Sequence, residues 1–257
     1  MCLVVAALDA HPEYALVVAA NRDEYHARAA LPAHWNVAPP CQDILAGRDL
    51  VAGGTWMGIR RDGRWALVTN VREGKAKFNP AAPSRGNLVP ALLNENGALA
   101  MRMEDADRYN GFNLLAGDAG SVMWASNRAT VAKVLDAGVH GLSNALLDTP
   151  WPKVLRTRQA ILDWSARGEG DLAPVFAALA DRTRAPDEAL PSTGVPLDTE
   201  RLLSAPFIVS ENYGTRCSTV LVVTRGGAVN FVERSFDARG DATGEVEFTF
   251  DVEGMRS

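Results

Sequence analysis

Cys2 is the residue whose position in the chain points most directly to chemistry, because it follows Met1 at the start of an apolar run. If Met1 is removed, Cys2 carries a thiol and a free α-amine with a pKa of about 8, which can act as the general base. Such a nucleophile needs a cation that favours the thiolate, a carboxylate that holds the amine and donors for an oxyanion. The alternative is a small apolar side chain in a buried strand.

A second polar cluster, Asn21-Arg22-Asp23-Glu24, directly follows the apolar run at residues 15–20. On an extended chain, successive side chains alternate, so Asn21 and Asp23 face one side while Arg22 and Glu24 face the other. The cluster alone is compatible with a polar site at a strand end. It is equally compatible with a solvated turn in which Arg22 and Glu24 are loosely paired.

Composition excludes several classes of function. The chain has 257 residues, with 26 Lys and Arg against 31 Asp and Glu, so no overall basic field favours nucleic acid or an anionic membrane. The chain has three cysteines, Cys2, Cys41 and Cys217, and they form no CxxC pair. This pattern predicts no metal site and a cytoplasmic location, with Cys41 and Cys217 as buried thiols. No run reaches the roughly 18 apolar residues of a membrane-spanning segment, and the sequence indicates no particular oligomeric state.

Four short apolar runs at residues 3–8, 15–20, 65–69 and 219–224 are typical of strands that are covered on both faces. Turn residues predict hairpins between the first two runs and around Asp62-Gly63, residues 118–120 and Gly226-Gly227. The strands should therefore pair mainly antiparallel.

Helices are predicted at residues 87–94, 151–166 and 171–180, with Thr149 as the cap of the second. An irregular, proline-rich excursion follows at about residues 184–197. Strands on both sides of a helical middle favour one α+β domain over residues 1–257, built as a four-layer αββα sandwich of two mainly antiparallel sheets. A three-layer mixed sheet gives nearly the same pattern and remains the alternative.

Several motifs occur in order along almost the whole chain, and together they are more specific than any short match. They are Asn21-Arg22-Asp23-Glu24, Ile44-Leu45-Ala46-Gly47-Arg48-Asp49-Leu50, Gly53-Gly54-Thr55-Trp56, Leu67-Val68-Thr69-Asn70, Ser84-Arg85-Gly86, Gly111-Phe112-Asn113-Leu114, His140-Gly141-Leu142-Ser143-Asn144 and Tyr213-Gly214-Thr215-Arg216. In this order they resemble the NRDE family, also called the transport and Golgi organisation family. The resemblance implies the fold of N-terminal-nucleophile (Ntn) hydrolases, an αββα sandwich.

The resemblance also implies a set of site residues, because amidases with this fold gather an N-terminal Cys, an Asp, two Asn and a late Arg around one pocket. The matching positions, which we take as the candidate catalytic set, are Cys2, Asp23, Asn70, Asn144 and Arg216. Those amidases usually carry an Arg three residues before the Asp, where this chain has Ala20, and a retained Met1 would leave Cys2 without a free amine. Both departures favour binding over hydrolysis.

Members of the resembled family are associated with haem trafficking and with acyl-coenzyme A binding, and both ligands are amphipathic anions. The expected ligand-binding residues are Asn21, Arg22, Glu24, Arg72, Lys75, Arg85 and His140, with Lys77 in the same basic loop at residues 71–86. No cofactor is required in this interpretation, and haem would be cargo.

The first hypothesis is therefore a protein that binds and hands over haem or a related amphipathic anion in an Ntn-type pocket. The second is an N-terminal-cysteine hydrolase of linear amides. A scaffold without catalysis is a third possibility.

Overall fold

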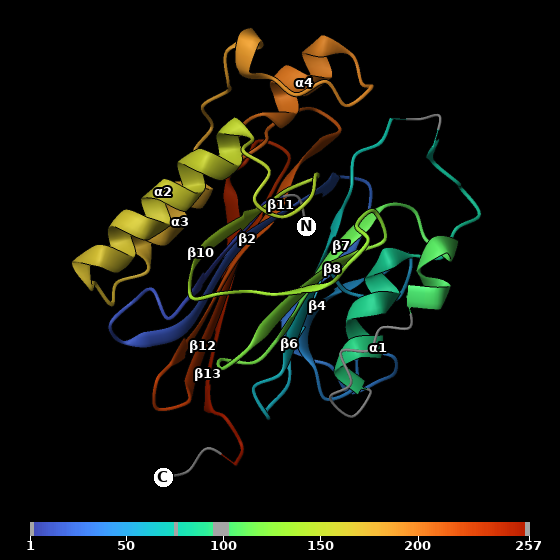
Figure 1. The fold of residues 1–257 in the computed structure, drawn as a ribbon. Helices are drawn as coiled ribbons and strands as arrows, with labels where there is room; N and C mark the ends of the chain where they lie inside the picture. The colour runs from blue at the N-terminus through green and yellow to red at the C-terminus, as the bar shows by residue number, and fades with distance from the viewer. Residues whose placement is uncertain (1–2, 75–76, 95–102, 255–257) are drawn as a thin grey trace.

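Two antiparallel sheets stack face to face in the computed structural model, which describes residues 3–74, 77–94 and 103–254 (Figure 1). The first sheet has six strands in the order β10-β1-β2-β11-β12-β13. Their bounds are β1 Leu3–Leu8, β2 Tyr14–Tyr25, β10 Gly138–Leu142, β11 Tyr213–Thr224, β12 Ala228–Phe236 and β13 Ala242–Asp251. The second sheet follows chain order from β3 to β9. Its strands are β3 Ala30–Trp35, β4 Leu45–Asp49, β5 Met57–Ile59, β6 Trp65–Asn70, β7 Phe112–Gly117, β8 Val122–Ser126 and β9 Lys133–Val134.

Helices cover the outer faces of both sheets and complete four layers. In Figure 1, α2 (Pro152–Arg167) and α3 (Ala173–Leu179) lie against the first sheet, whereas α1 (Leu88–Asn94) lies against the second. A further helix, α4 (Leu197–Leu203), lies beyond one end of the sandwich, and short 3-10 helices span Arg85–Asn87, Met103–Arg108 and Asp187–Ala189. The predicted α+β αββα sandwich is confirmed, and the three-layer alternative is wrong.

Three apolar clusters explain why the central strands are apolar on both faces. One fills the space between the sheets, one lies under α2 and α3, and one lies under α1. In β1, Val4 and Leu8 point into the cluster between the sheets, while Val5 and Ala7 point toward the helices. Every residue of β1 is therefore buried, as the sequence predicts.

The predicted hairpins are all present. β1 pairs with β2, β5 with β6, β7 with β8 and β11 with β12. Two strands are longer than their apolar runs, since β2 continues through the polar cluster to Tyr25 and β11 begins at Tyr213. The polar residues 21–24 consequently belong to a paired strand and not to a solvated turn.

Some details of the helices differ from the sequence prediction. Thr149 does not cap α2, because its hydroxyl donates to Leu146 O and Trp151 occupies the N-cap position. In the sequence, Leu155 and Leu162 fall on the apolar stripe of this helix, which predicts that they are buried, but both are about half exposed. The buried face of α2 instead includes Ile161 and the large ring of Trp164. The irregular excursion ends in α4, which the sequence did not indicate.

Candidate functional site

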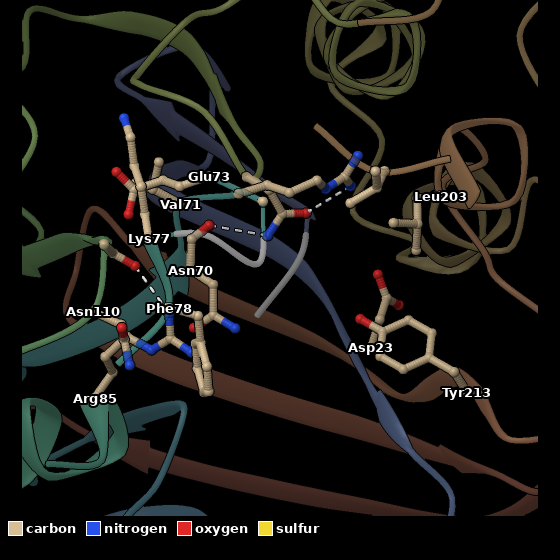
Figure 2. A pocket seen from close by; sticks show the side chains of 15 residues that line it. Asp23, Asn70, Val71, Glu73, Lys77, Phe78, Arg85, Asn110, Leu203 and Tyr213 are labelled. Carbon is tan, nitrogen blue, oxygen red and sulfur yellow. Dashed lines mark hydrogen bonds between the residues drawn. The ribbon is translucent and has the colours of Figure 1, made fainter. Parts of the chain in front are cut away.

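The candidate site is a pocket of about 300 Å³ at the ends of strands from both sheets. It is lined by Asp23, Asn70, Val71, Arg72, Glu73, Gly74, Lys77, Phe78, Arg85, Asn110, Gly111, Asn144, Val195, Leu203 and Tyr213. Figure 2 shows Asp23 and Tyr213 on one side of the opening and Asn70, Phe78 and Arg85 on the other. Three predicted catalytic residues, Asp23, Asn70 and Asn144, therefore share one pocket.

Asp23 is nearly buried near the end of β2, where the first sheet borders the pocket. Its neighbour across the strand pair is Thr215 of β11, whose Oγ1 donates to Asp23 Oδ1 over 2.7 Å. The same hydroxyl accepts from the backbone amide of Ile208. Thr215 thereby fixes the carboxylate orientation at the pocket wall, a role that sequence reasoning missed although Thr215 lies in a quoted motif.

Asn70 and Asn144 come from different sheets and meet at the pocket. Asn70 ends β6, and Asn144 follows β10; Asn144 Nδ2 donates to Asn70 O over 3.0 Å. The backbone amide of Arg72 donates to Asn144 O, which joins the segment after β6 to the segment after β10. No described residue forms a hydrogen bond with the Asn70 side-chain amide, so this donor is available to a ligand at the pocket.

A buried asparagine behind the pocket holds these two segments together. Asn113 of β7 donates from Nδ2 to Thr69 Oγ1 and to Ala145 O, and its Oδ1 accepts from Trp124 Nε1. Thr69 Oγ1 in turn donates to Ser143 O. The network links the end of β6 to the chain on both sides of Asn144, so it fixes the separation between the two pocket asparagines.

Arg216 is the exception among the described catalytic candidates, because it does not line this pocket. The β2 and β11 pairing shifts between Thr215, opposite Asp23, and Cys217, opposite Arg22. Arg216 is the extra residue of this bulge, and bulges redirect side chains. Its Nη1 donates to the carbonyls of Tyr25 and His26, and the residue lines a second cavity.

Arg22 and Glu24 border a groove of about 290 Å³ that adjoins the pocket. Pocket and groove share Asp23, Asn70, Phe78, Arg85 and Asn110. The Arg22 guanidinium carbon lies 4.2 Å from the centre of the Trp56 ring. Glu24 is largely satisfied locally, since its Oε1 accepts from the amide of Tyr25 and its Oε2 lies 3.8 Å from Arg28 Nε.

Asn21 has a structural role that makes it unsuitable as a ligand-binding residue. Its side chain is fully buried on the helix-facing side of β2. Nδ2 donates to Leu179 O and to Pro206 O, and Oδ1 accepts from Ser218 Oγ. With these bonds the amide has no group left for a ligand, and it ties β2 to the ends of α3 and of the excursion. The prediction that Asn21 contacts a ligand is therefore corrected.

The described cations of the basic loop lie around the pocket. Arg72, Lys77 and Arg85 line it, whereas Lys75 and the nucleophile candidate Cys2 lie outside the described residues. Arg85 Nη1 donates to Gly111 O. Lys77 is exposed and forms no ion pair within the described chain. It is thus the cation most available to an incoming anion.

Arg72 is fixed by a buried carboxylate from α4. Its Nη1 donates to Glu200 Oε2 over 2.8 Å, its Nη2 lies 3.4 Å from Asn144 Oδ1, and its guanidinium lies over Trp151. Glu200 Oε1 also accepts from the amide and hydroxyl of Thr193. The excursion, predicted as a surface loop, therefore supplies a pocket wall and holds one of its cations, which no sequence motif indicated.

His140 lies apart from the pocket and is held by two acceptors. Nδ1 lies 2.9 Å from Asp148 Oδ2, and Nε2 lies 3.0 Å from Asp136 O. The hydrogen bond to Asp148 raises the pKa of His140, and the same bond lowers that of Asp148 against the effect of burial. Since both ring nitrogens face acceptors, neither is free for iron, and the prediction of His140 as a ligand-binding residue is corrected.

The His140 and Asp148 pair predicts a pH-dependent stability. A raised histidine pKa stabilises the fold below about pH 6.5 and loses this effect as the pH rises through the folded value, whereas a lowered aspartate pKa stabilises it above about pH 4. We expect His140→Gln to lower the free energy of unfolding by about 1 kcal/mol between these limits, after allowing for solvent screening. Urea unfolding across this range and above it measures the difference, which should shrink toward alkaline pH. A difference independent of pH would contradict the charged pair.

The other described cysteines have no catalytic character. Cys41 and Cys217 are free and buried, as predicted. Burial raises the pKa of both thiols, so they stay protonated and are poor nucleophiles near neutral pH.

Within residues 3–74, 77–94 and 103–254, His, Cys, Asp and Glu side chains form no group of three that could hold a metal ion. No helix there has the length and apolar character needed to cross a membrane.

Comparisons with known proteins agree with this architecture. The Transport and Golgi organization protein 2 homolog of Bos taurus is 34% identical over 261 residues, covering 91% of this chain and 93% of the relative. The homolog of Homo sapiens is 33% identical over 261 residues, with the same coverage of each chain. Among solved structures, the mutant C2A conjugated bile acid hydrolase from Clostridium perfringens has a TM-score of 0.51 at 10% identity, covering 99% of this chain and 94% of that chain.

The bile acid hydrolase likeness concerns the fold alone at that identity, and it agrees with the Ntn-hydrolase-like sandwich described above. The family described as Transport and Golgi organisation 2 matches residues 1–238, which is most of the chain. With two animal relatives at about a third identity over nearly their full length, the chain belongs to the Transport and Golgi organisation 2 family.

Proposed function

We propose that the chain binds an amphipathic anion of the haem or acyl-coenzyme A class at the pocket between the two sheets, and hands it over to an acceptor. The observation that carries the proposal is the combination of cations and apolar side chains around one opening. Arg72, Lys77 and Arg85 stand beside Phe78 and Leu203. A pocket for a large anion with an apolar body needs these two kinds of surface side by side.

The extent of the opening supports a ligand larger than the pocket itself. The pocket of about 300 Å³ and the groove of about 290 Å³ share five residues. An amphipathic ligand can place its apolar body against Phe78, which borders both spaces, while an anionic group approaches Lys77. Asn70 offers an amide donor at the junction of the two spaces.

Haemin titration tests the proposal by absorbance. The wild-type protein should give a saturable change, and a Lys77→Gln, Arg85→Gln double variant should bind at least tenfold more weakly because two charge-assisted contacts are lost. Lys133→Gln is the matched control, since it removes one exposed lysine of β9, outside the pocket. Palmitoyl-coenzyme A added as a competitor decides whether the two ligands share the site.

Two results would contradict the proposal. One is a titration without saturation for the wild-type protein with both haemin and palmitoyl-coenzyme A. The other is a double variant that binds as tightly as Lys133→Gln while its far-ultraviolet circular dichroism matches that of the wild type.

Amide hydrolysis is the second candidate function, favoured by the shared position of Asp23, Asn70 and Asn144 in one pocket. In this mechanism Cys2, freed from Met1, attacks an amide carbonyl, and its α-amine accepts the thiol proton. The C–N bond then breaks as the α-amine passes that proton to the leaving amine, and water hydrolyses the resulting thioester. Asp23 would hold the amine, and the free amide of Asn70 would donate to the oxyanion. Intact-mass analysis combined with thiol labelling separates the two functions. Loss of Met1 with rapid, stoichiometric labelling of Cys2 at neutral pH supports the hydrolase, and retained Met1 excludes it.

A further inference from the structure

Arg22 is a buried cation that forms no ion pair with the residues that the structure describes. Only 5% of the residue is exposed. Its guanidinium lies over the Trp56 ring, yet no described residue accepts a hydrogen bond from it or forms an ion pair with it. Buried charges in proteins are normally paired, because removing them from water is costly. A buried guanidinium with no hydrogen-bond acceptor among the described residues therefore offers its donors to an anion.

The guanidinium borders a cavity of about 330 Å³, here called the Arg22 chamber, on the opposite side of β2 from Asp23. Its walls include Leu31, Trp56, Phe236 and Val246, which are apolar. The displaced Arg216 also lines it, and Arg216 Nε is buried without a partner in the described part of the chain. The chamber thus combines an apolar wall with two guanidiniums that have unused donors.

The acidic side chains of the chamber are already engaged elsewhere. Glu233 accepts from the amide of Ala33 and from Thr219 Oγ1, and it forms no ion pair with Arg22. Burial raises the pKa of Glu233, and the nearby positive charge of Arg22 acts in the opposite direction. Glu245 pairs with Arg234. The guanidiniums of Arg22 and Arg216 together carry one positive charge more than the Glu233 carboxylate can offset, and a single negative group would neutralise that excess.

We propose that the Arg22 chamber binds the carboxylate of an amphipathic ligand, with the planar forks of Arg22 and Arg216 facing the carboxylate and the apolar wall facing its hydrocarbon part. A carboxylate fits better than a phosphate, because one negative charge matches the chamber and two oxygens match a guanidinium fork. The inference rests on the proposed function for the class of ligand and assigns a second subsite to it. In this arrangement the pocket cations bind one anionic group of the ligand, and the Arg22 chamber binds another.

Octanoate and 1-octanol are suitable probes, since they share the hydrocarbon chain and differ in charge. Calorimetric titration of the wild-type protein should show octanoate binding at least tenfold tighter than 1-octanol. Arg22→Met should bind octanoate at least tenfold more weakly and leave 1-octanol binding unchanged.

Arg61→Met is the matched control, because Arg61 also lies over a tryptophan, Trp35, at 4.1 Å but is exposed and outside the chamber. It should bind octanoate as the wild type does. If Arg22→Met does not fold, Arg22→Gln, which removes the charge and keeps a donor, replaces it with the same expectation. Equal octanoate affinity in the Arg22 variant and the wild type overturns the proposal, as does equal wild-type affinity for octanoate and 1-octanol.

This experiment can fail independently of the proposed function. If haemin binding depends on Lys77 and Arg85 but octanoate binding does not depend on Arg22, the Arg22 chamber is not a ligand subsite and the proposed function of the pocket stands. If octanoate binding depends on Arg22 but neither haemin nor palmitoyl-coenzyme A binds, the Arg22 chamber is a carboxylate subsite and the proposed function is contradicted.

Discussion

Asn113→Ala is expected to lower the free energy of unfolding by about 4 kcal/mol, because it breaks three buried hydrogen bonds and leaves their partners unsatisfied. Asn113 is fully buried. The partners that lose a hydrogen bond are Thr69 Oγ1, Ala145 O and Trp124 Nε1. Urea unfolding followed by circular dichroism measures the change. Haemin affinity should fall as well, since Asn70 and Asn144 lose their common support.

Asn230→Ala is the control for this prediction, because Asn230 also lies in a strand but uses its side chain for an exposed bond to Glu247. It should change the free energy of unfolding by less than about 1 kcal/mol. Similar losses in the two variants would show that the Asn113 network does not hold the sheets together at the pocket.

Glu200→Ala has the second large expected effect, a loss of about 3 to 5 kcal/mol that is typical when one partner of a buried ion pair is removed. Arg72 would stay largely buried without its carboxylate, and the Thr193 amide would lose its acceptor. We also expect weaker haemin binding, because Arg72 is no longer held at the pocket wall. Chemical unfolding and the absorbance titration measure the two effects separately.

Arg201→Ala is the matched control, since it removes an exposed arginine of the same helix that pairs with Asp187 and Asp198. Exposed pairs of this kind contribute little, so stability and haemin affinity should match the wild type. A Glu200→Ala protein as stable as Arg201→Ala would mean that the excursion is not anchored through Arg72.

The sandwich was predictable because local patterns specify it. The run at residues 3–8 is apolar on both faces, which requires cover on both sides, and Asp62-Gly63 provides a tight turn between β5 and β6. The alternation in residues 21–24 was also correct, since Asn21 faces the helices and Arg22 faces the other sheet. Because side chains alternate between the two faces of a strand, the face of each residue is predictable once the strand is known.

The partners of those residues were not predictable, because they depend on distant segments. Nothing near Arg216 indicates that β11 bulges there against β2 and turns its side chain away from Asp23. Asn21 resembles a site residue in sequence. Only the structure shows that its side-chain amide already donates to the carbonyls of Leu179 and Pro206. Glu200 lies in a seven-residue helix after a proline-rich stretch, so its approach to Arg72 is set by tertiary structure alone.

The two faces of β2 border different spaces. Asp23 borders the pocket with Asn70, and Arg22 borders the chamber with Arg216. The groove is lined by both Arg22 and Asp23. Neighbouring residues of one strand therefore border two different spaces, which are the two subsites that we propose for the ligand.

An unbiased mass-spectrometric search for small molecules that copurify with the native protein tests the central claim most directly. The account predicts a near-stoichiometric amphipathic anion in the wild-type protein and its loss from the Lys77→Gln, Arg85→Gln variant, with retention in Lys133→Gln. A neutral or cationic molecule bound in its place, or an anion retained equally by all three proteins, would contradict the account.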